Sequence, residues 1–170
     1  MLTEQSLILA STCSRYFAWL LEQPGFRSIF LKNGDYPLGE DFFSDWLTRI
    51  NKKDEFMVMQ ELRRLRKTVL GHLVLRDING LADLDEVMHT MTFLAETALQ
   101  IAVQCASIQL SERYGDPIGH ESQSSQTLIV VGMGKLGGRE LNVSSDIDLI
   151  FTYPEEGETN GEKTISCKEF

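Results

Sequence analysis

The sequence predicts an α+β protein, in which a helical N-terminal half precedes the first two strands of a sheet. Up to about residue 114, apolar residues recur every three or four positions, which is the period of an amphipathic helix. Further on, two short apolar runs flank a glycine-rich turn and a pair of aspartates, as expected for strands joined by a functional loop. We therefore expect a helical region over 1–115, a polar linker over 116–126, and the start of a second domain over 127–170.

The composition is that of an ordinary globular protein, and its charge argues against several classes of partner. Of the 170 residues, 42% are hydrophobic and 24% are charged, and the net charge is −9. An acidic chain is a poor match for nucleic acid or for an anionic membrane surface, and no stretch approaches the roughly 18 apolar residues of a membrane span. The three cysteines are far apart, which predicts unpaired thiols in a reducing compartment. We expect a cytoplasmic protein without a targeting signal, with neither nucleic acid nor membrane as a partner.

Two helices are predicted within the first 50 residues. Residues 4–22 carry apolar side chains on one face, so they predict a single helix that Pro24 and Gly25 end. A polar loop with Asn33 and Gly34 follows. Residues 40–50 then predict a short helix whose aromatic side chains we assign to the core.

A long helix with a basic surface is predicted over residues 54–76. Apolar residues recur along one face at helical spacing, namely Phe56, Met59, Leu62, Leu65, Val69 and Leu73. The remaining faces carry four basic residues, namely Arg63, Arg64, Arg66 and Lys67. This surface is either simply solvated or meets a phosphate group or an acidic partner.

A second, longer helix is predicted to begin at Asp83 and to run to about Tyr114. Asp83 is a favourable N-cap residue, and Glu86 three positions later completes the pattern of a capping box. Gly115 and Pro117 then stop the helix.

Two aspartates, Asp146 and Asp148, precede the apolar run Leu149-Ile150-Phe151. We expect a strand over 146–153, in which side chains two positions apart share a face. Two neighbouring carboxylates in a buried strand repel each other unless a cation lies between them, and Mg²⁺ prefers such oxygen ligands. The pair therefore predicts a Mg²⁺ site, and the alternative is an exposed edge strand with two solvated aspartates.

The glycines before this pair allow two interpretations. Gly132, Gly134 and Gly137 spell GxGxxG after a predicted strand at 127–131, which is the literal dinucleotide-binding pattern. That pattern needs a full helix before the next strand, and only eleven residues, several of them poor helix formers, separate Gly134 from Asp146. The sequence therefore favours a different use of the turn.

A nucleotidyltransferase site fits both the glycines and the aspartates. Its pattern is two small residues on a short turn, seven or more residues, and then Asp-x-Asp. Here Gly137-Gly138 is followed by seven residues and then by Asp146-Ile147-Asp148. Glycine lets backbone N–H groups approach a phosphate closely.

The stretch GMGKLGGRELNVSSDIDLIFTYPE, residues 132–155, closely resembles the glutamine synthetase adenylyltransferase/adenylyl-removing enzyme family. This family belongs to the polymerase-beta-like nucleotidyltransferase superfamily and has two catalytic domains in one long chain. Asn142 and the pair Ser144-Ser145 are more similar to its first, adenylyl-removing domain. The arginine-rich run over 61–81 is similar to a helix of the same family.

The resemblance implies an activity and a role for each site residue. The parent domain would remove AMP from a tyrosine of glutamine synthetase by Mg²⁺-dependent phosphorolysis, releasing ADP, under nitrogen-signalling control by a PII protein. Phosphate and an adenine nucleotide would be its small-molecule partners. Asp146 and Asp148 would be catalytic metal ligands. The phosphate oxygens would be held by Gly137, Gly138 and Ser145, with positive charge from Lys135 or Arg139.

Superfamily sites use a third carboxylate on a later strand, and the resemblance implies that it lies beyond Phe170. We therefore expect an N-terminal fragment with an incomplete sheet, which alone should lack activity. The alternative function is a helical interaction module that docks glutamine synthetase or a regulatory protein and is inactive by itself.

Overall fold

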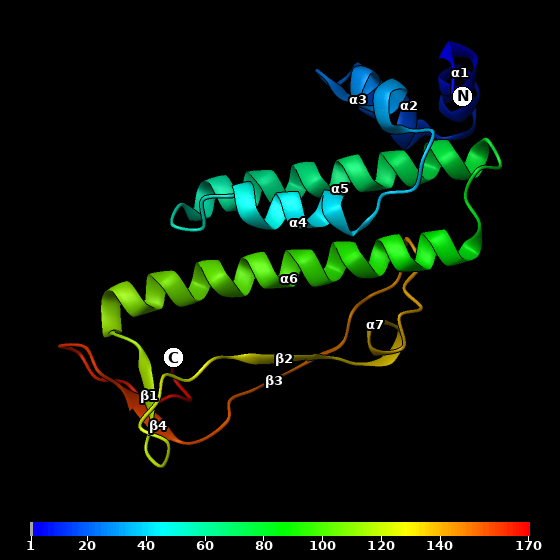
Figure 1. Cartoon of the computed structure of the whole chain (residues 1–170). Coiled ribbons are helices and arrows are strands. Elements are labelled where there is room, and N and C mark those ends of the chain that lie inside the picture. Colours follow the sequence, from blue (N-terminus) through cyan, green and yellow to red (C-terminus); the bar gives the residue numbers. More distant parts are fainter. Residues whose placement is uncertain (1) are drawn as a thin grey trace.

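The computed structural model describes residues 2–170 and places a helical part above a small β part, with the long helix α6 between them (Figure 1). The prediction of an α+β protein is confirmed at this level. In chain order the elements are α1 (Glu4–Cys13), α2 (Arg15–Glu22), α3 (Phe26–Asn33), α4 (Glu40–Arg49), α5 (Glu55–Ile78), α6 (Leu84–Tyr114), β1 (Pro117–Gly119), β2 (Ile129–Gly132), α7 (Gly134–Gly137), β3 (Leu149–Thr152) and β4 (Gly157–Thr159).

The N-terminal region differs from the prediction at two points. Residues 4–22 are not one helix, because the extended backbone of Ser14 separates α1 from α2. The Ser14 hydroxyl then accepts a hydrogen bond from the N–H of Phe17 at 3.2 Å, so this residue is the N-cap of a new helix. Helix α3 was also missed, since its eight residues are too few for a clear apolar period.

Two hydrophobic clusters pack against α5. One joins α4, α5 and α6 and includes the buried rings of Phe43 and Trp46, which confirms that these aromatics are core residues. The other joins α1, α2 and α3 to α5 and includes Phe17 and Phe30, whose ring centroids are 5.2 Å apart. Helix α5 therefore supports both halves of the helical region.

The turn between α5 and α6 is fixed by a buried ion pair. Arg76 donates two hydrogen bonds to the Glu86 carboxylate, at 2.6 and 2.9 Å, and its side chain is only 4% exposed. The same guanidinium donates to the carbonyl oxygens of Gly34 and Leu81, both at 3.0 Å. Asp83 caps α6 as predicted, but the carboxylate of Glu86 binds Arg76, so the second half of the capping box is absent.

Helix α6 is long and apolar enough to cross a membrane by length and composition alone, which corrects the expectation that no stretch approaches such a span. One helix of this kind is weak evidence for a membrane, because the core helix of a soluble protein passes the same test. Here α6 packs against α4 and α5.

The β part consists of two antiparallel pairs. Strands β2 and β3 pair in the register Ile129↔Thr152 to Gly132↔Leu149, so the two strands that flank the glycine turn are neighbours, as predicted. Strand β1 lies within the segment expected to be a plain linker and pairs with β4. The β2–β3 pair is exposed, since Ile150 and Phe151 are 50% and 57% accessible, so the prediction of a buried strand was wrong.

Removal of Glu86 should destabilise the helical region strongly. Glu86→Ala leaves the Arg76 guanidinium buried and unpaired, which typically costs about 3–5 kcal/mol. The control Asp45→Ala breaks the exposed pair with Arg49 and should cost about 0.3–0.5 kcal/mol. Urea unfolding of both variants measures the difference, and equal losses would contradict the structural role of the buried pair.

His72 should make stability depend on pH. Burial lowers its pKa from 6.5 to about 4, although its ring donates a hydrogen bond to the Tyr36 carbonyl at 3.0 Å. The unfolded chain therefore binds a proton near pH 6.5 that the native state does not. Stability should fall by about 3 kcal/mol as the pH drops from 6.5 to 4. His72→Gln should flatten this dependence in urea unfolding, whereas the exposed control His89→Gln should not.

Candidate functional site

The glycine turn begins where β2 ends, at Gly132, and continues into the single helical turn α7. The N–H of Met133 donates to the carbonyl oxygen of Asp148 at 2.8 Å, which ties the turn to the segment that carries both aspartates. The N–H groups of Gly137 and Gly138 donate to the carbonyls of Met133 and Gly134, at 3.2 and 2.9 Å. These two amides are therefore used inside the turn.

Three glycines of the turn have different structural requirements. Gly134 has φ +53°, a left-handed conformation that favours glycine. At Gly137, a Cβ atom would lie 2.5 Å from the carbonyl oxygen of Gly132, so the backbone contact excludes a side chain. At Gly138, a Cβ atom would meet nothing closer than 3.4 Å and φ is −81°. The fold therefore requires glycine at 134 and 137 but not at 138.

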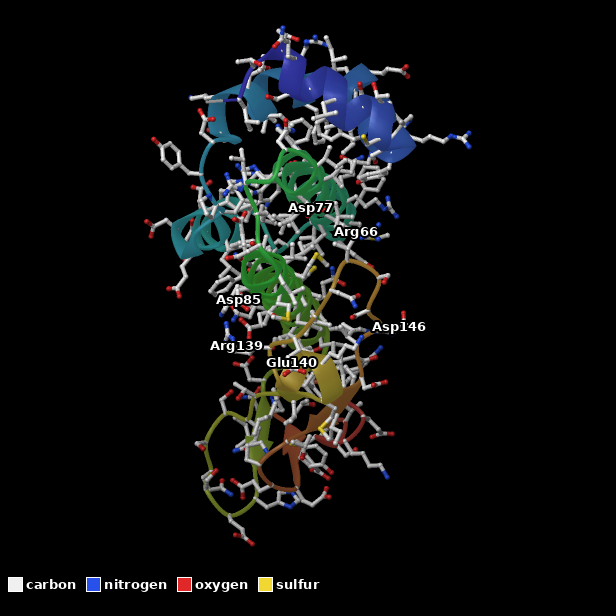
Figure 2. The ribbon with its side chains drawn as sticks, turned by 90° about the vertical axis from the view of Figure 1, so that its right-hand side faces the viewer. Arg66, Asp77, Asp85, Arg139, Glu140 and Asp146 are labelled. Carbon is white, nitrogen blue, oxygen red and sulfur yellow. The ribbon has the colours of Figure 1, made fainter. Side chains whose placement is uncertain are left out.

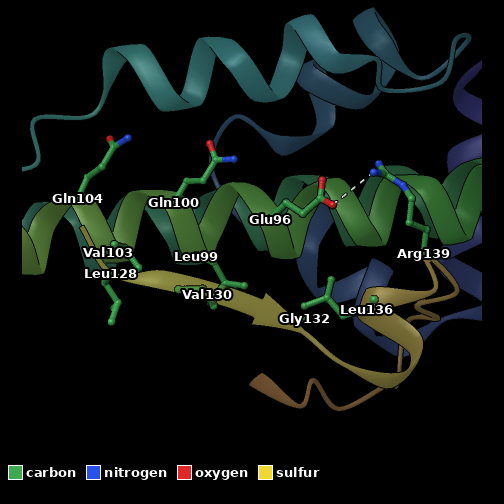
Figure 3. A pocket seen from close by; sticks show the side chains of 11 residues that line it. Glu96, Leu99, Gln100, Val103, Gln104, Leu128, Val130, Gly132, Leu136 and Arg139 are labelled. Carbon is green, nitrogen blue, oxygen red and sulfur yellow. Dashed lines mark ion pairs between the residues drawn. The ribbon is translucent and has the colours of Figure 1, made fainter. Parts of the chain in front are cut away.

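Arg139 holds the turn against α6. Its guanidinium pairs with the Glu96 carboxylate at 3.5 Å (Figure 3). The guanidinium also lies 5.4 Å from the centre of the Phe93 ring. Its backbone has φ +58°, which is unusual for a residue with a side chain. Arg139 was predicted to add positive charge at a phosphate, and here a carboxylate already pairs with that charge.

A groove of about 490 Å³ separates the turn from α6. Figure 3 shows Leu99 and Gln100 of α6 on one side of it and Val130 of β2 on the other. Leu136 is buried at one end of this groove and packs against Gly132.

Asp146 and Asp148 lie just before β3 and not within it, because the strand begins at Leu149. The prediction that they share the face of a strand was therefore wrong. Both side chains are exposed, so each carboxylate is hydrated without burial cost. The Asp148 carboxylate faces the start of the turn, since its Oδ2 atom lies 3.8 Å from the position of a Cβ built on Gly134.

The segment before Asp146 is shaped by Asn142, a residue to which the sequence analysis assigned no chemical role. The Asn142 side-chain oxygen accepts hydrogen bonds from the hydroxyls of Ser144 and Ser145, at 3.2 and 2.9 Å. The Ser145 hydroxyl also accepts from the N–H of Asn142 at 3.1 Å. An asparagine followed within three residues by two serines is a signal for such a turn. In this arrangement the Ser145 hydroxyl serves the turn.

The chemistry available to the site is that of two exposed carboxylates beside a tight glycine turn. Aspartate oxygens are the ligands that a hard divalent cation prefers, so this donor pair fits Mg²⁺ with the remaining positions left to water and phosphate. Within residues 2–170 no group of three or more His, Cys, Asp or Glu side chains is placed to hold a metal ion. Lys135 is exposed on the same turn, where its charge is available to an anion.

The chain is thus an α+β protein in which a short glycine turn, held to α6 by Arg139, is followed by two exposed acids. Comparison with known sequences gives the family. The sequence model of the glutamate-ammonia ligase adenylyltransferase family matches residues 4–170, and the chain belongs to that family.

Several curated relatives share the description bifunctional glutamine synthetase adenylyltransferase/adenylyl-removing enzyme. The relative from Nitrosomonas europaea is 44% identical over 162 residues, which are 92% of this chain and 17% of that protein. The relative from Aromatoleum aromaticum is 43% identical over 167 residues, which are 98% of this chain and 18% of that protein. The one from Chromobacterium violaceum is 58% identical over 109 residues, or 64% and 12% of the two chains. The chain thus spans less than a fifth of the length of these relatives.

Alanine at the two adjacent glycines should have opposite effects on stability. Gly137→Ala forces a Cβ atom against the carbonyl of Gly132 and should destabilise the chain by about 1–3 kcal/mol. Gly138→Ala fits the existing backbone, so it should be neutral or stabilising by up to about 1 kcal/mol. Thermal unfolding of the two variants is the measurement. A Gly138→Ala variant that melts as low as Gly137→Ala would show that the turn is tighter than described.

Proposed function

We propose that the complete protein containing this chain removes AMP from a modified tyrosine of glutamine synthetase by phosphorolysis, and that ADP is released. Two observations support this proposal. Relatives that cover nearly the whole chain are described as adenylyl-removing enzymes of glutamine synthetase. Asp146 and Asp148 present carboxylates beside the glycine turn that have no ion-pair partner among residues 2–170, which is the observation on which the proposal mainly depends.

In this proposal Asp146 and Asp148 hold Mg²⁺. When bound, the ion supplies charge neutralisation at the phosphoryl oxygens. The exposure of both side chains leaves room for a substrate to approach them. The hydrogen bond between Met133 and Asp148 keeps residues 146–148, the acidic segment, at a fixed position relative to the turn.

The other predicted site residues take roles that follow from their contacts. Gly138 is exposed and the fold itself does not require glycine there, so we assign its glycine to close approach of a phosphate. Lys135 is free to contribute positive charge. Arg139 positions the turn on α6, and Ser145 positions Asp146 through the Asn142 turn. A direct Ser145 contact to phosphate would require its hydroxyl to leave Asn142.

The proposed partners follow from the same activity. They are glutamine synthetase, an adenine nucleotide, inorganic phosphate and a PII protein that adjusts the reaction in nitrogen assimilation. We also propose a cytoplasmic location, consistent with the three unpaired thiols of Cys13, Cys105 and Cys167. The 170 residues by themselves should not release ADP, because two carboxylates supply only part of the ligand set of a superfamily site.

A docking role without catalysis by this site is the alternative, and exposed apolar residues on the first two helices favour it. Ile8, Leu9 and Trp19 are 59%, 47% and 41% accessible. Such side chains suit a protein surface. Replacement of Asp146 or Asp148 separates the two functions.

Replacement of either aspartate should abolish chemistry without unfolding the protein. In the complete protein, Asp146→Asn or Asp148→Asn should lower the rate of ADP release from adenylylated glutamine synthetase by orders of magnitude, because each removes a charge that holds the metal. Without metal the melting temperature should stay the same or rise, since the two like charges no longer repel each other. Mg²⁺ should raise the melting temperature of the wild type more than that of either variant.

Two results would count against this function. Near-normal turnover by either variant would remove the aspartates from the chemistry and favour docking. A melting temperature far below that of the wild type without metal would make the carboxylates structural. Asp45→Asn, an exposed change on α4, is the control for nonspecific effects of losing one negative charge.

A further inference from the structure

A second groove lies on the side of the hairpin that faces the acidic segment. It has a volume of about 360 Å³ and is bordered by α5 and α6 on one side and by residues 141–147 on the other. Seven of its eleven lining side chains are apolar, including Leu94, Leu141 and Ile147. None of the eleven is acidic, although the chain has a net charge of −9.

Two arginines of α5 line this groove. Arg63 and Arg66 are three positions apart, so their side chains leave the same face of the helix. Both are exposed, and neither has an ion pair or hydrogen bond to another residue of the described chain. The Arg66 charge acts on Tyr16, where it opposes the rise in pKa that burial causes.

The neighbouring basic residues behave differently. Arg64 pairs with Glu61 at 3.9 Å, and Lys67 lies 4.8 Å from the centre of the Trp19 ring. Most of the other arginines of the described chain also have carboxylate partners, namely Arg27, Arg49, Arg76 and Arg139. Within the described chain Arg15 and Arg113 also lack a carboxylate partner, but each lies on a different helix. What distinguishes Arg63 and Arg66 is that two such guanidinium groups line one groove.

The groove leads directly to the proposed catalytic segment. Asn142 and Ser145 line it together with Arg66, and Asp146 is the next residue along the chain. Figure 2 shows Arg66 and Asp146 on the same side of the molecule, while Arg139 and Asp85 lie on the other. An anion held by the arginines would thus lie next to the turn that positions Asp146.

We propose that Arg63 and Arg66 form an anion site for a phosphate group, carried by inorganic phosphate or by an adenine nucleotide, at the edge of the carboxylate pair. This inference rests on the proposed function and adds residues of α5 to its substrate site. Guanidinium groups bind phosphate oxygens through paired N–H donors. The apolar floor lowers the local dielectric constant and strengthens this attraction.

The two arginines also offset the repulsion between a phosphate group and the two aspartates. A phosphate dianion that approaches Asp146 and Asp148 is repelled by both carboxylates. Arg63 and Arg66 supply two compensating positive charges from a different element, without pairing with the aspartates themselves. The site therefore binds phosphate even when no divalent cation is present.

Binding to the 170-residue chain in metal-free buffer at fixed ionic strength tests this site. Inorganic phosphate and AMP are titrated separately by calorimetry on the wild type, on Arg63→Ala/Arg66→Ala and on Arg64→Ala as the matched control. The double variant should bind phosphate, AMP or both at least about tenfold more weakly, since each arginine makes charge-assisted hydrogen bonds. Arg64→Ala should change affinity less than twofold. The ligand that is lost identifies the carrier of the phosphate group.

Kinetics in the complete protein provide a second measurement. The double variant should raise KM for phosphate or for the adenylylated substrate more than it lowers kcat, and Arg63→Lys/Arg66→Lys should recover part of the loss. Unchanged affinities and KM values in the double variant, or an equal loss in Arg64→Ala, would overturn the proposal.

The outcome is separable from that of the proposed function. Asp146→Asn removes a like charge, so in metal-free buffer it should leave phosphate affinity unchanged or increase it. If the aspartate variants lose turnover while the arginine variants bind phosphate normally, the anion site fails and the proposed reaction stands. If the aspartate variants keep turnover while the arginine variants lose phosphate binding, the proposed reaction fails and the anion site stands.

Discussion

The buried pair between Arg76 and Glu86 is the interaction on which the arrangement of the chain depends. It closes the hairpin of α5 and α6, and through the carbonyl of Gly34 it also fixes the end of α3. Helix α5 then supports both hydrophobic clusters. Further along the same helix α6, Glu96 pairs with Arg139 and so holds the glycine turn. The hairpin that the buried pair closes therefore also carries the contact to the glycine turn.

Much of the helical region could be predicted because its signals are local. Asp54 and Asp83 accept hydrogen bonds from the N–H groups of Met57 and Glu86, as their positions before two apolar periods indicate. The break at Ser14 was not predicted, because a serine within an apolar period is compatible with either a continuous helix or a cap. The pairing of Glu86 with Arg76 could not be predicted from local patterns either, since the capping box and this ion pair compete for the same carboxylate.

The pairing of the strands at the candidate site was predictable from the sequence, but the geometry of its aspartates was not. The spacing from Gly137-Gly138 to the aspartates gave the right neighbours, because β2 and β3 pair directly. The same spacing could not show that β3 begins after Asp148, since Leu149 continues the apolar run without a marked boundary. It also could not assign Arg139 to Glu96, because that contact joins residues 43 positions apart in the chain, on elements that no local pattern relates.

Helix α5 and the candidate site are far apart in the chain, but residues of both line one groove, in which the arginines of α5 carry the charge. Two guanidinium groups without anionic partners among the described residues line a groove, and the two exposed aspartates lie on the segment that continues from its Ser145 side. Direct pairing between them would neutralise both and leave nothing for a ligand. Asn142 and Ser145 hold the intervening turn through their own hydrogen bonds, and no ion pair joins the two charged groups within the described residues. Under the proposed function, a small ligand with both phosphate oxygens and a bound cation would meet the arginines at one end and the aspartates at the other.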